Sequence, residues 1–325
     1  MKAIVCTAYG PPEVLKRKEI PKPQPQPDEI LIKVYATTVT VADRRVRSFD
    51  VPKGAWLPAR LALGISKPRR PVLGIELAGM VEAVGRNVTR FQAGDAVFAS
   101  TLNGFGAYAE YICLKAESPV AHKPENISFA EAAALPIGAL TALHYLKKTP
   151  IGPGKKILIY GASGSVGTYA VQLARHFGAE ITGVCSGANM KLVSSLGADT
   201  VIDYTQSDFA ARLATYDIVF LAVDKLPFSV CQRILSPSGI YLNATQPLKS
   251  PSMLWTSWTS NKKVYVGENI KQTAALTQEL KELVEGGKIY PVIDRSYALD
   301  QIVEAHRYVD RGHKKGNVVI RVIPS

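Results

Sequence analysis

Cysteine is scarce in this chain of 325 residues and occurs only as Cys6, Cys113, Cys185 and Cys231. No two of these residues form a C-x-x-C pair, and each stands among apolar or strand-forming residues. This spacing excludes a zinc knuckle and a disulfide framework. We therefore expect the cysteines to be reduced and mostly buried.

Long apolar runs are also missing, because no stretch approaches the length of about 18 residues that a membrane span needs. The N-terminal apolar strand reaches Pro11 too early for a signal peptide, and no arginine-rich transit segment precedes it. The sequence therefore predicts a cytoplasmic protein that does not cross a membrane.

Long runs of like charge are absent as well, although the net charge is +12. The basic residues stand in small groups, of which the densest are residues 16–18, 44–45, 67–70 and 313–315. None has aromatic residues interleaved as in a nucleic-acid surface, so nucleic acid is not an expected partner. Most of these side chains are expected to be solvated, and their field would attract an anionic dinucleotide.

The length suits two domains, and the first third of the chain is rich in strand signals. Residues 30–34, 79–84, 96–99 and 108–114 are expected strands, separated by turns that contain Gly, Asn and Asp. Short strands at this spacing predict a small β-barrel or folded sheet.

The pattern changes after Pro124. Ser128 and Glu131 form a capping box before an Ala-rich helix, and a second helix is expected over residues 138–146. From Lys155 onward, strands and helices alternate, which predicts a doubly wound parallel sheet. The expected strands are 157–160, 181–185, 200–202, 218–223, 240–242 and 264–266, and the expected helices are 166–177, 191–196 and 272–284. A helix over 299–309 and a strand over 318–322 follow, and we expect that strand to return to the N-terminal domain.

The strongest local signal is a glycine-rich turn between the apolar strand 157–160 and an amphipathic helix. Gly164 lacks a β-carbon, so a pyrophosphate can approach the backbone, and Gly167 lets the helix pack closely on the sheet. Free amides at the helix N-terminus favour an anion. Ala162 replaces the first glycine of the G-x-G-x-x-G pattern, and a turn without a ligand is the alternative. The expected cofactor contacts here are Ala162, Ser163, Gly164, Ser165, Val166 and Gly167.

The residues after the second strand favour NADPH over NADH. NAD-specific sites place a carboxylate there, whereas this chain offers the Ser186 hydroxyl and, a few residues on, the Lys191 ammonium. A carboxylate about 4 Å from a 2′-phosphate would cost on the order of 1–4 kcal/mol. An exposed helix lysine without a ligand is the alternative interpretation of Lys191.

A series of motifs, in order and nearly end to end, resembles the medium-chain dehydrogenase/reductase family and its quinone oxidoreductase branch. These motifs are residues 71–79, 81–85, 94–97, 104–111, 132–136, 140–142, 195–199, 201–204, 286–289, 304–306 and 316–319.

The resemblance implies an α/β fold made of two domains. A GroES-like β-barrel catalytic domain would comprise residues 1–124 and 290–325, and a Rossmann NADPH-binding domain residues 125–289, with a cofactor cleft between them. Thr141 would lie near the nicotinamide, and homodimers would pair at the sheet edge near residues 264–266. Further cofactor contacts would be Ser186, Lys191 and Tyr204 around the 2′-phosphate and Asn317 from the last strand.

The resemblance also implies that the chain works without zinc. The positions that match the catalytic zinc ligands of the family are Thr40, Ile75 and Pro136, and none can bind the metal in that geometry. The clustered cysteines of the family's structural zinc loop are absent too, so we expect no metal ligand. A further departure is Leu221-Ala222-Val223-Asp224, where the family usually has Asp-x-Val-Gly.

We therefore expect a hydride transfer from NADPH to a small electrophilic acceptor, either a quinone or an activated enone. No residue is identified as a catalytic acid, and solvent could donate the proton. Thr40 could hydrogen-bond the acceptor oxygen, or it could be an ordinary strand-end threonine. Trp56, Phe105 and Trp255 are candidate acceptor walls, although core packing explains each equally well. The alternative functions are a 2-enoyl-thioester reductase and a non-catalytic protein that binds NADPH or RNA.

Overall fold

The computed structural model describes residues 1–323 except 52, 53, 55, 102, 103, 246, 247, 268, 269 and 271. The chain divides into two compact units. Unit 1 comprises Met1–Ile137, Gln272–Glu285 and Pro291–Ser325, and unit 2 comprises Gly138–Lys271 and Gly286–Tyr290.

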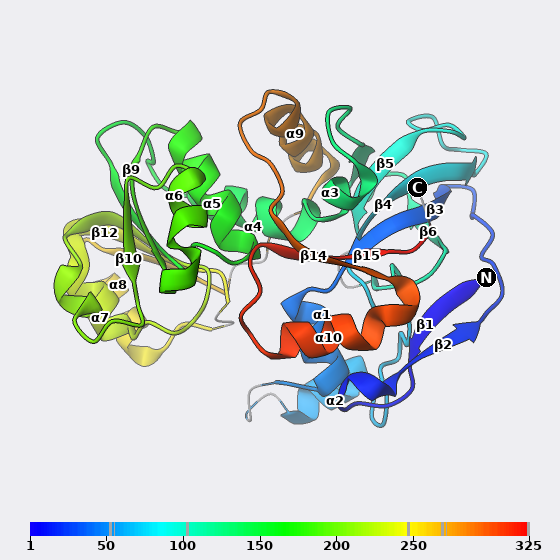
Figure 1. Ribbon diagram of the computed structural model, residues 1–325, viewed down its shortest axis with the longest axis horizontal. Helices are drawn as coiled ribbons and strands as arrows, with labels where there is room; N and C mark the ends of the chain where they lie inside the picture. Colours follow the sequence, from blue (N-terminus) through cyan, green and yellow to red (C-terminus); the bar gives the residue numbers. More distant parts are fainter. Residues whose placement is uncertain are drawn as a thin grey trace. The chain divides into compact units, whose positions relative to one another are not determined.

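Unit 2 is built on a parallel sheet in the strand order β10-β9-β8-β11-β12-β13 (Figure 1). This order places the chain reversal between β8 and β11, and it confirms the doubly wound arrangement expected from the alternating pattern. The strands are β8 (Lys156–Tyr160), β9 (Glu180–Cys185), β10 (Thr200–Asp203), β11 (Tyr216–Leu221), β12 (Leu235–Asn243) and β13 (Lys263–Val266).

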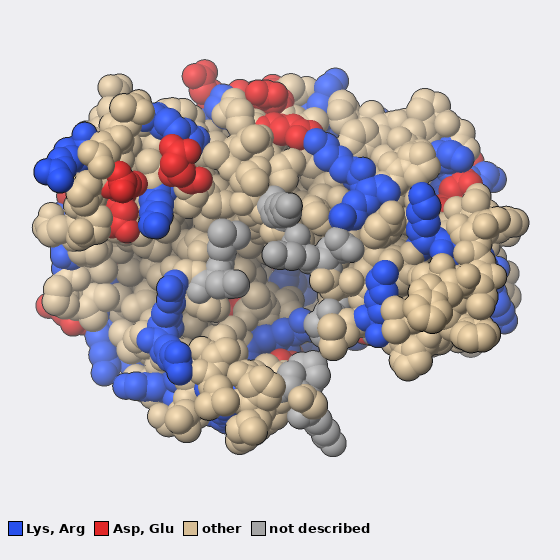
Figure 2. Space-filling model, turned by 180° about the vertical axis from the view of Figure 1, so that it is seen from behind, with Lys and Arg blue, Asp and Glu red and all other residues tan. Residues whose placement is uncertain are grey.

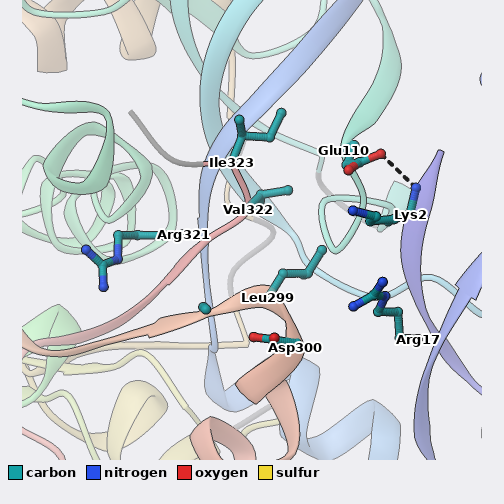
Figure 3. Close-up of a pocket in the computed structure, with 9 residues that line it drawn as sticks. Lys2, Arg17, Glu110, Leu299, Asp300, Arg321, Val322 and Ile323 are labelled. Atoms are coloured by element: carbon teal, nitrogen blue, oxygen red, sulfur yellow. Dashed lines mark hydrogen bonds between the residues drawn. The ribbon is translucent and has the colours of Figure 1, made fainter.

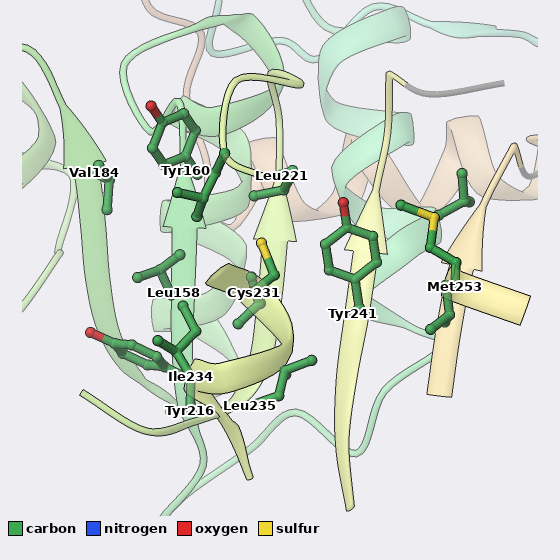
Figure 4. Close-up of a cluster of buried hydrophobic side chains, with 14 of the residues drawn as sticks. Leu158, Tyr160, Val184, Tyr216, Leu221, Cys231, Ile234, Leu235, Tyr241 and Met253 are labelled. Atoms are coloured by element: carbon green, nitrogen blue, oxygen red, sulfur yellow. The ribbon is translucent and has the colours of Figure 1, made fainter. Parts of the chain in front are cut away.

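The sheet of unit 2 buries apolar side chains because helices cover it. Beside the sheet lie α4 (Pro136–Leu146), α5 (Ser165–His176), α6 (Met190–Ser195), α7 (Phe228–Ile234) and α8 (Pro251–Thr259). Figure 4 shows Leu158, Leu221 and Tyr241 on neighbouring strands, with Cys231 of α7 packed against them. Cys231 has no exposed surface, so this cysteine belongs to the core as expected.

Unit 1 holds a mostly antiparallel sheet in the order β14-β15-β3-β4-β5-β7, with β6 also paired to β3, and a separate pair β1-β2. The long strand β3 pairs with β4 along one edge, and along its other edge β6 pairs with its first half and β15 with its last residues. The expected return of the last strand is confirmed, because Val319 of β15 pairs with Thr38 of β3. The strands are β1 (Lys2–Cys6), β2 (Leu15–Glu19), β3 (Glu29–Thr38), β4 (Glu76–Val84), β5 (Ala96–Ser100), β6 (Tyr111–Lys115), β7 (Val120–His122), β14 (Ile293–Ala298) and β15 (Asn317–Arg321).

The helices of unit 1 are α1 (Val41–Ser48), α2 (Trp56–Leu63), α3 (Phe129–Ala133), α9 (Ala274–Glu285) and α10 (Ile302–Asp310). The capping box expected at α3 is confirmed, since the Ser128 and Glu131 side chains each accept from the other's backbone amide. Helix α9 packs on β7, and the Asn126 side chain donates to the Val284 carbonyl. Helix α9 and residues 125–137 therefore belong to unit 1, whereas the sequence pattern groups them with the Rossmann strands.

None of the helices in the described part of the chain combines the length and the apolar composition that crossing a bilayer requires.

Candidate dinucleotide and acceptor sites

The glycine-rich turn of unit 2 is held against the neighbouring strand. The amides of Gly161 and Ala162 donate to the carbonyl of Val184 at 2.9 and 3.0 Å, and Gly161 has a φ of 82°. A β-carbon on Gly161 would stand 2.7 Å from the Val223 side chain. Glycine is thus required here both by the left-handed backbone and by the close approach of Val223.

Helix α5 begins directly after this turn, at Gly164. Gly164 is the N-cap with φ −80° and ψ 177°, and no side chain caps the first turn. A β-carbon on Gly167 would lie 2.1 Å from the Gly161 carbonyl oxygen, so Gly167 lets the helix touch the turn. The α5 N-terminus therefore offers its backbone dipole and uncapped first turn to an anion at the point where the strand order reverses.

The residues expected around the adenosine end follow the carboxyl ends of β9 and β10. Ser186 precedes a short 3-10 helix, Gly187–Asn189, and the Asn189 amide group donates to the Ser163 hydroxyl at 3.0 Å. The Tyr204 amide donates to the Cys185 carbonyl, while Lys191 is exposed on α6. This part of unit 2 therefore brings together Ser163, Ser186 and Tyr204 by backbone and side-chain contacts.

Asp203, at the end of β10, is a charged residue at this site that sequence reasoning missed. A β-carbon on Gly187 would lie 2.6 Å from its carboxylate oxygen. The amide and hydroxyl of Thr205 donate to Asp203 and lower the pKa of its carboxyl group, which is therefore ionised at neutral pH. An acid was sought only after the second strand, whereas Asp203 comes from the adjacent strand β10 and pairs with Cys185 in register.

Asp224 stands where the family's Asp-x-Val-Gly pattern has glycine, and it has a structural role in this chain. The side chain of Asn243, at the end of β12, donates to Asp224 at 3.1 Å and to the Tyr241 hydroxyl at 3.0 Å. Asp224 therefore satisfies a buried amide at the sheet edge.

Thr141 and Asn317 lie in different units. Thr141 is a buried residue of α4 in unit 2. Asn317 begins β15 in unit 1, where its side chain donates to the Val292 carbonyl at 3.1 Å. Their roles toward the cofactor stay predictions.

Unit 1 contains an apolar cavity of about 630 Å³ beside α1 and α2. Its volume and composition are those of a small-molecule site. Phe105, expected as an acceptor wall, does line it and has a φ of 54°. The described residues that line it are Ala42, Val46, Ala62, Leu63, Pro68, Arg69, Arg70, Ile75 and Phe105.

The two tryptophans expected as walls lie outside this lining. Trp56 is 51% exposed, packs edge-on against Phe49 and lies over the Arg60 guanidinium. Trp255 is 68% exposed on α8, which belongs to unit 2. Neither indole lines the cavity of unit 1, so their contact with an acceptor stays a prediction.

Thr40 caps helix α1. Its hydroxyl donates to the Asp43 carboxylate at 2.6 Å, and the Asp43 amide donates back to that hydroxyl at 3.1 Å. Asp43 is fully buried, and burial raises its pKa to about 6. These contacts show that Thr40 has a structural role as the cap of α1. Its hydroxyl could donate to an acceptor oxygen only if Asp43 were protonated or the cap opened.

Zinc does not fit the residues present at the family's ligand positions. Ile75 lines the apolar cavity, and the Thr40 hydroxyl is engaged in the α1 cap. Among the residues that the structure describes, no group of three or more His, Cys, Asp and Glu side chains could hold a metal ion. The donors that zinc requires are therefore missing at these positions.

A buried carboxyl group, Glu76, follows Ile75 and was not identified from the sequence. It is 1% exposed and accepts from the Thr38 hydroxyl and, at 2.7 Å, from the Ile137 amide. Burial is the main cause that raises its pKa to about 7, and repulsion from Asp43 adds to this effect. Only the fold reveals this pair of buried acids, because Asp43 and Glu76 are far apart in sequence.

A second cavity of unit 1, of about 550 Å³, is less suited to an apolar acceptor (Figure 3). Side chains of both charges line it, including Arg17, Glu110 and Asp300. Figure 3 shows Glu110 accepting from the backbone amide of Lys2, at 2.8 Å. The cavity beside Ile75 is therefore the better candidate for an apolar small molecule.

Basic residues do not form one band on the face drawn in Figure 2. Lys and Arg side chains lie there in small groups separated by other residues. This scatter is typical of a solvated surface rather than of a nucleic-acid track.

Two family models match the chain: "Alcohol dehydrogenase GroES-like domain" over residues 26–125 and "Zinc-binding dehydrogenase" over residues 196–320. The 2-methylene-furan-3-one reductase of Solanum lycopersicum is 34% identical, and the match covers 100% of this chain and 80% of that protein. The chloroplastic NADPH-dependent alkenal/one oxidoreductase of Arabidopsis thaliana is 33% identical with the same coverage. The solved quinone oxidoreductase from Coxiella burnetii superimposes with a TM-score of 0.85 at 27% identity, covering 99% of both chains.

Proposed function

Because the chain belongs to the medium-chain dehydrogenase/reductase family, in its quinone oxidoreductase-like branch, we propose that it reduces a quinone or an activated enone with NADPH and without zinc. The observation that carries the proposal is the uncapped N-terminus of α5, preceded by the tight Gly161 turn at the reversal of the sheet. The proposal assigns dinucleotide binding to unit 2 and acceptor binding to unit 1.

A bound NADPH supplies a hydride for the electron-poor carbon of the acceptor. The chain's own contribution in unit 1 is an apolar cavity that positions the acceptor. Asp43 holds the Thr40 hydroxyl in the α1 cap, and Thr40 is not among the described residues that line the cavity, so the proton that completes the reduction comes from solvent.

An NADPH-consumption screen tests this function. Ortho-quinones, para-quinones, enones and enoyl thioesters are compared, each with and without a metal chelator. We expect turnover with quinones or enones that is unchanged by chelation. Turnover with enoyl thioesters alone would identify a thioester reductase, and salt-sensitive RNA binding without any turnover would favour a binding protein. Loss of activity on chelation would contradict the zinc-free mechanism.

NADPH preference is proposed to depend on Lys191. Its exposed ammonium can pair with a 2′-phosphate and gains nothing from a 2′-hydroxyl. Lys191→Ala should raise KM for NADPH about tenfold, as expected for one lost charge-assisted contact, and leave KM for NADH unchanged. Lys156→Ala is the matched control, because Lys156 is an exposed lysine at the opposite, amino end of β8. An equal change in KM for NADPH and for NADH would show that Lys191 does not contact the 2′-phosphate.

We also propose a homodimer paired at β13. In the described part of the sheet of unit 2, β13 is an end strand, and α8 packs beside it. Trp255 and Trp258 of α8 are 68% and 85% exposed, an apolar face that a second copy would cover. Sedimentation equilibrium tests this, and a monomeric mass at micromolar concentration would contradict it.

A further inference from the structure

The acceptor cavity of unit 1 combines apolar walls with cations. Its walls come from α1, α2 and the segment after α2, and none of the described side chains that line it carries a carboxylate. Arg69 and Arg70 are the charged residues of this otherwise apolar set of described residues. Apolar walls suit any enone or quinone, whereas a guanidinium at the wall adds affinity only for an acceptor that brings its own negative charge.

The turn that carries Arg69 is held in a defined conformation. The Arg69 amide donates to the Leu63 carbonyl at 2.7 Å, and the Tyr9 hydroxyl donates to the Gly64 carbonyl at 3.0 Å. A β-carbon on Gly64, which has a φ of 125°, would lie 2.1 Å from the Lys67 carbonyl oxygen. The Arg69 side chain is therefore presented by a structured turn and not by a free loop end.

Arg69 differs from other arginines of unit 1 in the partners that the described residues offer it. The guanidinium groups of Arg44 and Arg47 pair with Asp310, and that of Arg60 lies over aromatic rings. Within the described residues, by contrast, the side chain of Arg69 has no ion-pair partner and remains exposed to solvent. A ligand that enters the cavity thus meets a guanidinium whose donors are available.

We propose, on the basis of the function proposed above, that the acceptor carries an oxyanion group, a carboxylate or a phosphate, which Arg69 binds while the apolar walls hold the rest of the molecule. A guanidinium presents a planar fork of donors that matches both oxyanions and binds them with two parallel hydrogen bonds. Arg70, the next residue, also lines the cavity but already has an interaction elsewhere in the fold.

The test compares straight-chain enones that end in a carboxylate, a phosphate monoester or a methyl ester. For the wild type, we expect kcat/KM to be at least about tenfold higher for one of the charged acceptors than for the ester. Arg69→Gln should abolish this ratio by lowering kcat/KM for the favoured charged acceptor to the value for the ester in the same variant. Arg45→Gln, which removes an exposed arginine of α1 outside the lining, should keep the ratio. Whichever charged acceptor is favoured identifies the oxyanion.

Binding measurements separate this inference from the proposed function. The saturated, non-reducible analogues of the three compounds are titrated into the protein by calorimetry. Tighter binding of a charged analogue that is lost in Arg69→Gln supports the oxyanion site even if no acceptor is turned over. Equal binding of charged and neutral analogues to the wild type, or a preference that survives in Arg69→Gln, overturns the inference, whatever the enzyme reduces.

Discussion

Gly164→Ala is expected to weaken NADPH binding about ten- to a hundredfold while unit 2 stays folded. The backbone of Gly164 has ordinary extended angles, and an added β-carbon would meet only the Gly161 carbonyl oxygen, at 3.4 Å. The turn therefore accepts alanine. A pyrophosphate that approaches the α5 N-terminus would meet the added methyl group and lose one or two charge-assisted contacts to the main chain.

Calorimetric titration with NADPH measures the loss, and thermal unfolding checks the fold. Gly152→Ala is the matched control, because a β-carbon there comes no closer than 3.8 Å to any described group and the residue lies outside the turn. The control should keep the wild-type dissociation constant and melting temperature. Unchanged NADPH affinity in Gly164→Ala would show that the dinucleotide does not lie against this turn.

Gly167→Ala, in contrast to Gly164→Ala, should destabilise the fold itself. The comparison distinguishes a glycine that a ligand approaches from a glycine that the packing of α5 requires. Its β-carbon would stand 2.1 Å from the Gly161 carbonyl oxygen and 2.8 Å from the Ala162 Cα. Both contacts are to backbone, so α5 must move away from the sheet. We expect lost stability in the absence of any ligand, seen as a lower melting temperature.

Much of unit 2 could be predicted because its signals are local. The apolar run of β8 is buried on both faces, and α5 shows one apolar stripe, so period and length identify each element directly. Helices α7 and α8 were missed, because both are short, their sequences have no clear apolar stripe, and a proline stands at the start of each, before α7 and as the first residue of α8. Helix α9 shows a clear helical pattern, but only tertiary contacts decide that it packs on β7.

The residues of the candidate sites also fall into two groups: those that a local sequence signal predicts and those that only tertiary contacts reveal. The glycine turn is contiguous in sequence, whereas its backbone hydrogen bonds to Val184 of β9 depend on the pairing of the strands. Asp203 and Glu76 could not be found by spacing, since each becomes part of a site only when two strands are placed side by side. Arg69 was noticed only as part of a basic group, and the cavity that it lines depends on where α1, α2 and Ile75 meet.

The pair of buried acids beside the acceptor cavity leads to a large pH effect. The pKa of Glu76 rises from 4.5 to about 7 and that of Asp43 from 3.8 to about 6, both chiefly through burial. These two carboxyl groups therefore hold more protons in the folded chain than in the unfolded chain between about pH 4 and pH 7. By linkage, their contribution to the unfolding free energy falls as pH rises through this window and levels off above it. The buried His306 gives the opposite slope below about pH 6.5, because burial lowers its pKa to about 3, so the effect of Glu76 is measured as a difference between a variant and the wild type.

Glu76→Gln should remove the part of this fall in unfolding free energy that the ionisation of Glu76 causes. A shift of this size corresponds to about 3 kcal/mol between pH 5 and pH 8, and a neutral amide does not titrate. The glutamine can still accept from the Ile137 amide and donate to the Thr38 hydroxyl. We expect the variant to match the wild type near pH 5 and to be more stable by about 3 kcal/mol at pH 8.

Urea unfolding at the two pH values measures this difference. A Trp255→Phe/Trp258→Phe background leaves Trp56 as the sole tryptophan, so its fluorescence follows unit 1. Measurements stop at pH 8, because burial lowers the pKa of Lys314 to about that value and its titration adds an opposite slope above it. Glu82→Gln is the control on the same strand: hydrogen bonding to Lys22 lowers the pKa of that carboxyl, so its stabilisation is lost as pH falls. An equal pH dependence in Glu76→Gln and the wild type would mean that Glu76 is already ionised in the folded protein at pH 5.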